Sequence, residues 1–592
     1  MIRFKGLSIV YFFAAIAVVL VLTAILGSFA ASFQVDTESG ESLWSLENYA
    51  SVFADPDFLK VTANTVIQGI GSVLVMLFFA VPLTWFLTLT DFRRKNVVFT
   101  LLTIKLAVPT FIVAMSYVFL FNPSSGMVNK LFIDWTGAPL FNIYSLFWVC
   151  VIQGISLTPA CVFMLVPAFQ NMDGTLEEAC KVSGVRFAKT LFHITLPILA
   201  PAIIAAALFF FVVSVELFDV VGVIGLPGGI QVLSIWIYDK LHPTVGLANH
   251  GGATATGSVL FILTAAAIFF YIRFLRRSER FTLVTGKRIQ SKPISLGRYR
   301  WAANLFVSFW VCLAVVIPFA TLIWSSLVPY LSPPSMEALR QISLIGYRDA
   351  FAYIGEPLRN TLLFMVLTIL LTLCMTISCS WLITRSRMRM RNWLDAVIFF
   401  SPAIPSMVVA VSLLYASFRV QQWLPLYGSI WLLVIAMSVR MLAFSTRTLN
   451  ANAIQFHKEL DEAAYTSGVP PFRVLLRVFL PLVTPALFYS ALMVGMLSAR
   501  ELTVPLIIGS ADLPLLSTLI FDLQGLGYYD TAGALSTLFI CILVVLALLS
   551  KWVLDRSQNA MRLNGERRQK GKGSAASEKP FSEKALPKAE NF

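Results

Sequence analysis

Long apolar runs recur along the whole chain, and they constrain its fold more than any other feature. About twelve of them hold roughly 20 residues, enough to cross a ~30 Å hydrocarbon core at 1.5 Å per residue. They lie near residues 8–32, 61–88, 97–121, 143–168, 195–221, 255–275, 301–328, 358–384, 393–418, 429–450, 475–498 and 531–554. Because 58% of the 592 residues are hydrophobic and only 13% are charged, we expect an all-α polytopic membrane protein with about 12 transmembrane helices. The first run is too long for a cleaved signal peptide and is expected to be a retained helix.

Lysine and arginine gather between alternate apolar runs, which predicts the orientation in the membrane. With the N-terminus in the cytoplasm, the basic segments at 93–95, 273–300 and 385–391 are all cytoplasmic. The segment 34–60, on the outer side, carries six acids and a single lysine. Both termini are therefore expected in the cytoplasm. The net charge of +14 is explained by topology and by attraction to anionic lipid, and it does not indicate nucleic-acid binding.

Two polar blocks between apolar runs repeat one another. "EEACKVSGVRFAKTLFHITLP" (177–197) and "DEAAYTSGVPPFRVLLRVFLP" (461–481) share eight of 21 positions without a gap. "VPTFIVA" (108–114) likewise matches "IPSMVVA" (404–410), and "VLSIWIYDKL" from Val232 matches "LLSTLIFDLQ" from Leu515. The chain is therefore a duplication. Since each half has six apolar runs, an even number, the halves form a parallel repeat.

The repeat divides the chain into four parts. We expect a first six-helix repeat at 1–280, a basic cytoplasmic linker at 281–300, a second six-helix repeat at 301–556 and a disordered basic cytoplasmic tail at 557–592. The two repeats differ in one outer loop, 122–142, which is about twelve residues longer than its counterpart. This difference breaks the symmetry on the outer face.

Each polar block is predicted to contain a short helix. In the first block Thr175 and Glu178 fit a capping box, and Gly184 lies where a helix would end. In the second block the corresponding helix covers 459–467 and ends at Gly468. A nine-residue helix is only ~13 Å long and marginal in water, so it needs a surface to dock against. The alternative, an amphipathic helix that merely joins two spans, does not explain the shared spacing.

The two blocks resemble the cytoplasmic "EAA" loop of permease subunits in type I ABC importers. The positions that carry the resemblance and its ATPase-coupling role are Glu178, Ala179, Gly184 and Pro197 in the first block, with Glu462, Ala463, Gly468 and Pro481 in the second. Cys180 and Val478 depart from the usual motif only by small apolar changes.

The resemblance implies that each short helix is a coupling helix held by an ATP-binding subunit. It also implies two copies of an ABC ATPase, a periplasmic or extracellular solute-binding protein, and a bacterial inner membrane as the location. "GVRFAKT" from Gly184 lacks the second glycine of a phosphate-binding loop. The chain is therefore expected to be no enzyme and to hold no cofactor, with ATP and Mg²⁺ bound by the partner.

The solute is indicated less directly. Glu216, Asp219, Arg500 and Glu501 lie near the outer ends of equivalent runs. They are candidates for a pathway or outer gate, or else interfacial helix ends. "ERFTLVTGK" (279–287), "RELTVPL" and "STLIFDL" resemble the ferric iron group of fused permeases. Related fused permeases serve thiamine, 2-aminoethylphosphonate, polyamines or phosphorylated sugars, and these remain alternatives.

A gradient-driven secondary transporter with twelve spans is the competing class. It would be expected to carry intramembrane acids or histidines for coupling, whereas Lys105 is the one ionisable residue deep in the early runs of the first half. The four histidines have no ligand spacing and the seven cysteines form no Cys-x-x-Cys pair. No metal site is therefore expected within the chain.

Overall fold

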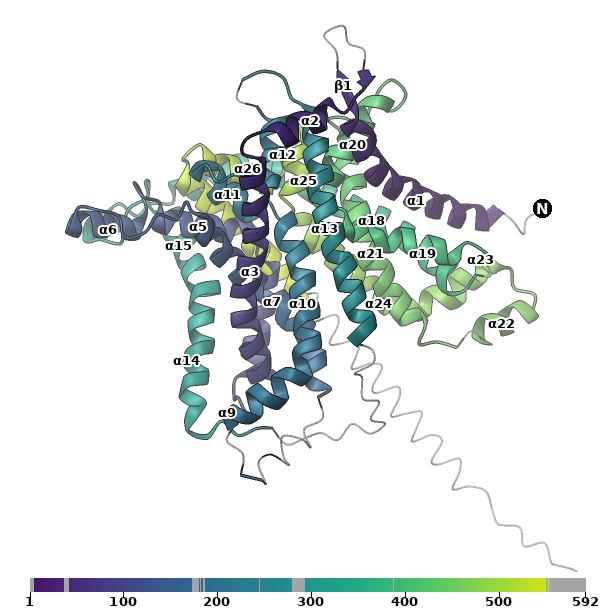
Figure 1. Cartoon of the computed structure of the whole chain (residues 1–592), viewed down its shortest axis with the longest axis horizontal. Helices are drawn as coiled ribbons and strands as arrows, with labels where there is room; N and C mark the ends of the chain where they lie inside the picture. The colour runs from purple at the N-terminus through teal and green to yellow at the C-terminus, as the bar shows by residue number, and fades with distance from the viewer. Residues whose placement is uncertain are drawn as a thin grey trace, which may run out of the picture.

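The computed structural model describes residues 5–36, 42–172, 180, 183–184, 187–243, 245–278, 293–386, 388–457, 459–549 and 552. Helices dominate these residues. The strands that it contains, β1 (Gln34–Asp36) and β2 (Ser42–Trp44), pair antiparallel in a small hairpin. Figure 1 shows a bundle of long helices, with the hairpin at one end and α9 (Phe187–Thr190) at the other.

Ten helices among the described residues are long and apolar enough to cross a membrane. They are α1 (Lys5–Ser32), α3 (Phe58–Thr88), α7 (Leu146–Gln170), α10 (Leu196–Glu216) with the π-helical turn before it, α13 (His250–Ser278), α14 (Arg300–Val311) continuing through α15 (Ile317–Leu327), α18 (Gly355–Thr384), α21 (Ile430–Ala453), α23 (Pro471–Val474) continuing into α24 (Leu480–Ala499), and Tyr529–Leu549. The expectation of an all-α polytopic fold is confirmed, and these ten fall where the sequence predicted spans.

The remaining two predicted spans, 97–121 and 393–418, are not single helices. The first consists of α4 (Lys95–Ala107) and α5 (Thr110–Phe121), which meet at 93°. The second consists of α19 (Arg391–Phe400), a 3₁₀ turn (Ser401–Ala403) and α20 (Ser406–Val420). Pro109 and Pro405 cause the breaks, because proline has no N–H to donate and disfavours a helical residue before it.

Two bent segments at the same end of the bundle as the hairpin were not predicted. In the first half, α11 (Asp219–Gly228) and α12 (Leu233–Leu241) meet at 75°. In the second half, α25 (Thr503–Ile508) and α26 (Leu516–Gly525) occupy the equivalent place. Each helix is too short to cross a membrane, so a search for runs of about 20 residues could not find it.

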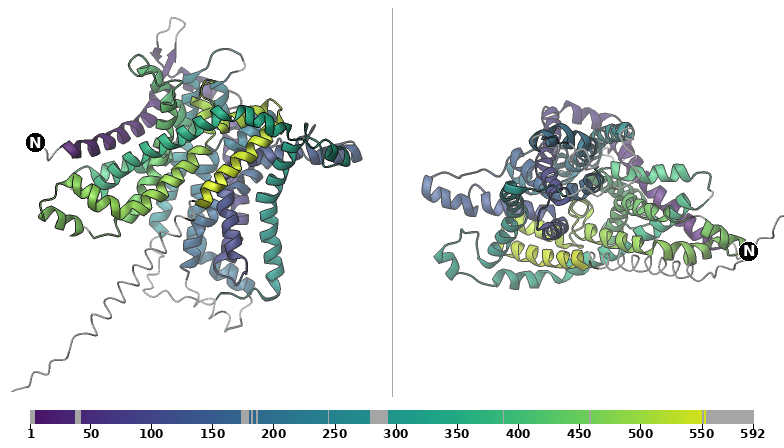
Figure 2. Two further views of the ribbon diagram at one scale, coloured as in Figure 1. Left: turned by 180° about the vertical axis from the view of Figure 1, so that it is seen from behind. Right: turned by 90° about the horizontal axis from the view of Figure 1, so that it is seen from below.

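The two halves interlock. α1, the first helix of the first half, packs along α18 and α20 of the second half as well as along α13. In return, α15 of the second half packs against α5 of the first. Figures 1 and 2 show α1 running beside the green helices of the second half. The largest buried apolar cluster accordingly draws residues from both halves.

The C-terminal end of the linker is fixed to the first half. Ile294 and Thr90 form an isolated parallel bridge. Asp91 accepts hydrogen bonds from the backbone N–H of Leu296 at 3.0 Å and from Arg300 at 2.6 Å. We call this contact the linker clip.

Shorter helices among the described residues include α2 (Glu47–Ala54), α6 (Met127–Thr136), α16 (Met336–Arg340), α17 (Ile345–Tyr353) and α22 (Glu459–Thr466).

Candidate functional site

The second polar block forms the short helix that the sequence predicted. α22 covers Glu459–Thr466, one residue less than expected. Gly468 follows with a φ of +78°, a conformation that glycine adopts without strain. Glu462 and Ala463 are exposed on this helix. They are therefore free to face a partner, and Pro481 follows as the second residue of α24.

The first polar block is described only in part. Glu178 and Ala179 lie outside the described residues, as does most of the predicted helix at 175–183. Gly184 has a φ of +71°, matching Gly468, and Pro197 is the second residue of α10. Where the two blocks can be compared, they turn in the same way.

A buried arginine ties α22 to the transmembrane helices. Arg385, at the end of α18, donates to the carbonyl oxygens of Ala453 at 2.8 Å and Phe456 at 3.0 Å, and lies 3.2 Å from the carboxylate of Asp461. The two charged side chains are only 4% and 9% exposed. Burial raises the pKa of Asp461, while the Arg385 guanidinium opposes that rise. Sequence analysis missed this contact, since nothing local links positions 385 and 461.

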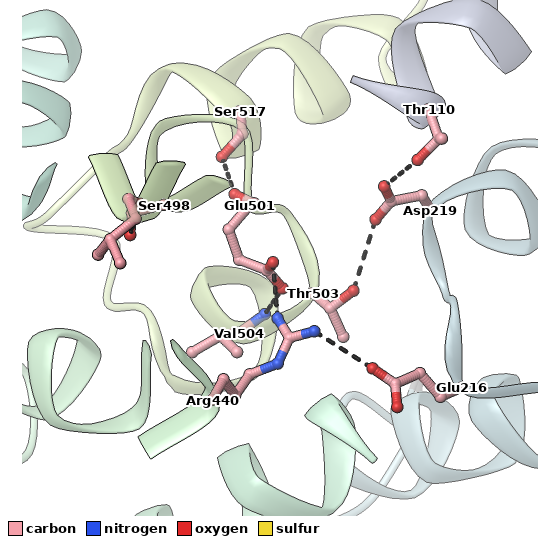
Figure 3. Close-up of polar contacts among 10 residues, drawn as sticks. Thr110, Glu216, Asp219, Arg440, Ser498, Glu501, Thr503, Val504 and Ser517 are labelled. Carbon is pink, nitrogen blue, oxygen red and sulfur yellow. Dashed lines mark hydrogen bonds and ion pairs between the residues drawn. The ribbon is translucent and has the colours of Figure 1, made fainter. Parts of the chain in front are cut away.

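The four candidate pathway residues do lie together, at the junction of the two halves. Glu216 ends α10, Asp219 begins α11, and Arg500 and Glu501 directly follow α24. Figure 3 shows the centre of this group, in which Arg440 from α21 lies between two carboxylates. Its guanidinium is 3.2 Å from Glu216 of the first half and 2.7 Å from Glu501 of the second. We call this group, with Lys105, the central charged cluster.

Helix N-termini supply a second set of contacts to the same carboxylates. Asp219 accepts a short hydrogen bond from the Thr110 hydroxyl at the start of α5, and lies 3.5 Å from the Thr503 hydroxyl of α25. Glu216 accepts from the backbone N–H of Ser406 at the start of α20. The two breaks caused by proline thus turn two helix N-termini toward the centre, where their positive dipole ends favour negative charge.

Two further cations complete the cluster. Arg500 donates to the carbonyl oxygen of Leu106, next to Lys105 in α4. Lys105 is 1% exposed, and its ammonium has no hydrogen-bond partner among the described residues. The ammonium also lies close enough to Arg500 for their like charges to interact. A buried ammonium without a partner is costly, so this position suggests a function.

Ion pairs of the cluster join the two halves, but its side chains are not arranged to hold a metal ion. Among the described residues, no three His, Cys, Asp or Glu side chains are grouped so that they could hold one. One sign of Arg440 in the sequence was overlooked, because it is an arginine near the middle of the apolar run at 429–450. Lys105 was noticed only as an argument against a secondary transporter.

Comparison with known proteins settles the family. The model of the family described as "Binding-protein-dependent transport system inner membrane component" matches residues 80–280 and again 375–563. The chain belongs to this family. It is therefore a multi-pass membrane permease of the ABC importer type, built as two copies of the family domain, and the reading as a gradient-driven transporter is set aside.

Several curated relatives of this permease cover much of its length. It is 22% identical over 493 residues to the "Ferric transport system permease protein FbpB" of Actinobacillus pleuropneumoniae, covering 82% of this chain and 69% of that one. It is 23% identical over 381 residues to the "Fe(3+)-transport system permease protein FbpB 2" of Haemophilus influenzae, covering 64% and 70%. The "Sulfoquinovosyl glycerol transport system permease protein SmoG" of Agrobacterium fabrum is 26% identical over 243 residues, covering 39% and 77%.

Proposed function

We propose that this permease forms the membrane pathway of an ATP-driven importer for iron(III). A soluble binding protein delivers the solute on the outer side, and two ATPase subunits bind the cytoplasmic polar blocks. ATP and Mg²⁺ belong to those subunits, and the permease itself carries out no hydrolysis. Both of its termini lie in the cytoplasm.

One observation carries the importer mechanism. The same polar block stands at the same place in both halves, and each block contains a glycine with positive φ at the equivalent position, Gly184 and Gly468. Each block is followed directly by the helix that leads to the central charged cluster, α10 in the first half and α24 in the second. Movement of a block by an ATPase would therefore be transmitted along one helix to Glu216 or Arg500.

Iron(III) is favoured as the solute by the relatives. Two of the relatives described above, each matching at least 64% of this chain, are named for ferric transport. The match to the sulfoquinovosyl glycerol permease covers only 39% of it. Thiamine, 2-aminoethylphosphonate, polyamines and phosphorylated sugars are the alternatives.

The test is uptake of radiolabelled iron in a strain that lacks other iron routes, with and without the gene for this permease. We expect uptake that depends on the gene and on ATP. Parallel assays with labelled thiamine, 2-aminoethylphosphonate and spermidine provide the comparison. Iron uptake that is the same in both strains, with gene-dependent uptake of one of the other solutes, would contradict the proposal.

A further inference from the structure

One charged side chain of the central charged cluster, Lys105, takes part in none of the ion pairs described above. Lys105 is buried, has no hydrogen-bond partner in the described part of the chain, and lies near a second cation, Arg500. Two like charges buried near each other repel, and an unpaired buried ammonium loses its hydration without compensation. An anion between them would remove both costs.

The surroundings of this pair are built to attract an anion. The N-termini of α5 and α20, helices of 12 and 15 residues, both lie beside carboxylates of the cluster. Thr110 and Ser406, which begin these helices, hold Asp219 and Glu216 respectively. In transporters, broken helices commonly direct such N-termini at the anionic groups of a solute. Here the chain's own carboxylates occupy them.

We propose that Lys105 and Arg500 form a binding site for oxyanion groups of the solute, and that Asp219, held by Thr110 at the start of α5 and close to Arg500, competes with the solute for Arg500. This inference rests on the proposed function for its solute. Iron(III) would then cross as a complex with carboxylate or phosphate oxygens, recognised through those oxygens, and not as a bare cation held by protein ligands. The absence of a grouped metal-ligand set among the described residues agrees with this.

The charges of the cluster allow the exchange. Two cations, Arg440 and Arg500, lie among three carboxylates, Glu216, Asp219 and Glu501, whereas the charged neighbour of Lys105 is Arg500. When the solute's oxyanion binds Lys105 and Arg500, Asp219 must move away from Arg500, because like charges would otherwise meet. Binding of solute would thus loosen a contact that joins the two halves.

The test measures thermal unfolding of the purified full-length permease, followed by tryptophan fluorescence, with ferric citrate, citrate alone, inorganic phosphate, or chloride at matched ionic strength. A ligand that binds only the folded protein raises the unfolding midpoint. We expect a rise with an oxyanion over chloride, absent in Lys105→Met and retained in Lys105→Arg. Lys60→Met, at an exposed position 73% accessible to solvent, should behave like the unaltered permease.

Asp219→Asn gives the result that a purely structural role would not. Removing this carboxylate removes the competitor, so the oxyanion should bind several-fold more tightly, while Lys105→Met should weaken it. An effect of ferric citrate alone would identify the iron complex as the ligand, whereas equal effects of phosphate and citrate would show recognition of the oxyanion itself; either supports the site. No rise over chloride in both the unaltered permease and Asp219→Asn, or a full rise in Lys105→Met, would overturn it. Iron uptake by strains that carry the same variants separates the two proposals. Iron uptake without an oxyanion effect leaves the proposed function intact. An oxyanion effect without iron uptake removes iron as the solute.

Discussion

The two halves of the permease differ most where they meet. Leu196 and Leu480, which begin α10 and α24, lie 284 positions apart, and so do Glu216 and Arg500. Equivalent positions thus carry opposite charges. In an exact duplicate, two glutamates or two arginines would approach each other across the symmetry axis and repel. A fused chain lets each half change separately, so that the junction can be closed by attraction.

Arg440 is a second charged residue of the junction that has no equivalent charge in the other half. It bridges a carboxylate from each half, while the position 284 residues earlier, Ser156, is neutral. The second half therefore supplies the cation that joins the halves and the first half supplies a carboxylate. The polar blocks, by contrast, turn alike wherever both are described. Symmetry is kept where two identical ATPase subunits would bind and lost where one solute would pass.

Replacing Arg440 should have the largest effect on this junction. Arg440→Met leaves Glu216 and Glu501 near each other without their counter-ion, at a cost of about 3 kcal/mol. We expect a lower unfolding midpoint and loss of solute uptake. The triple variant Glu216→Gln, Arg440→Met, Glu501→Gln removes the stranded charges and should regain stability without regaining uptake. A single variant as stable as the unaltered permease would show that the bridge does not join the halves.

The glycines of the two polar blocks test whether the coupling face is truly symmetric. Nothing lies within 4 Å of a Cβ placed on Gly184 or Gly468, so any effect of Val at either site comes from the positive φ alone. That strain is about 1–2 kcal/mol for a residue with a side chain. We expect each variant to reduce uptake and ATPase co-purification to a similar degree. Gly355→Val, at an uncrowded position whose φ lies outside the left-handed region, is the control.

Arg385 anchors α22 in the second half and has no charged counterpart in the first half. Its replacement should therefore affect only the second half, with a smaller effect. Arg385→Met leaves Asp461 buried without its partner and frees α22 from the end of α21. We expect ATPase binding to persist while uptake falls several-fold. The position 296 residues earlier is Leu89, so Leu89→Met is the matched control in the first half. Equal losses in both variants would argue against a specific role for Arg385.

The linker clip should show the smallest effect. The backbone N–H of Leu296 and the Arg300 guanidinium hold the pKa of Asp91 below its usual value of 3.8. Its contribution is therefore present above that value and is lost only as the pH falls through the lowered pKa. At neutral pH Asp91→Asn should modestly speed tryptic cleavage of the segment 287–292, with little change in uptake, because the ion pair is partly exposed. Asp57→Asn, which removes a pair at Lys60, is the control, and cleavage equal in the two variants would refute the clip.

Sequence alone predicted the parts of this molecule that depend on length and local pattern. Ten spans, the duplication and α22 follow from runs of apolar residues and from capping and turn residues. The broken spans could have been found from Pro109 and Pro405, which interrupt otherwise helical runs. The contacts of Arg385 and Arg440 could not have been found in that way, because their partners lie far away in the chain. Four residues of the central charged cluster, Glu216, Asp219, Arg500 and Glu501, were singled out together as candidates for a pathway or outer gate. That Arg440 and Lys105 lie with them could not be predicted.

The crossing of α1 into the second half has a consequence for how this permease is made. α1 is synthesised first, yet its neighbours α18 and α20 begin at Gly355 and Ser406. During synthesis α1 must therefore wait in the membrane for more than half the chain to be made before it can pack against these two helices. Contacts so distant in sequence form slowly, and an incomplete bundle exposes surfaces that can associate wrongly. Fusion of the two halves keeps the late helices close to the early one, and it ensures that neither half is produced without the other.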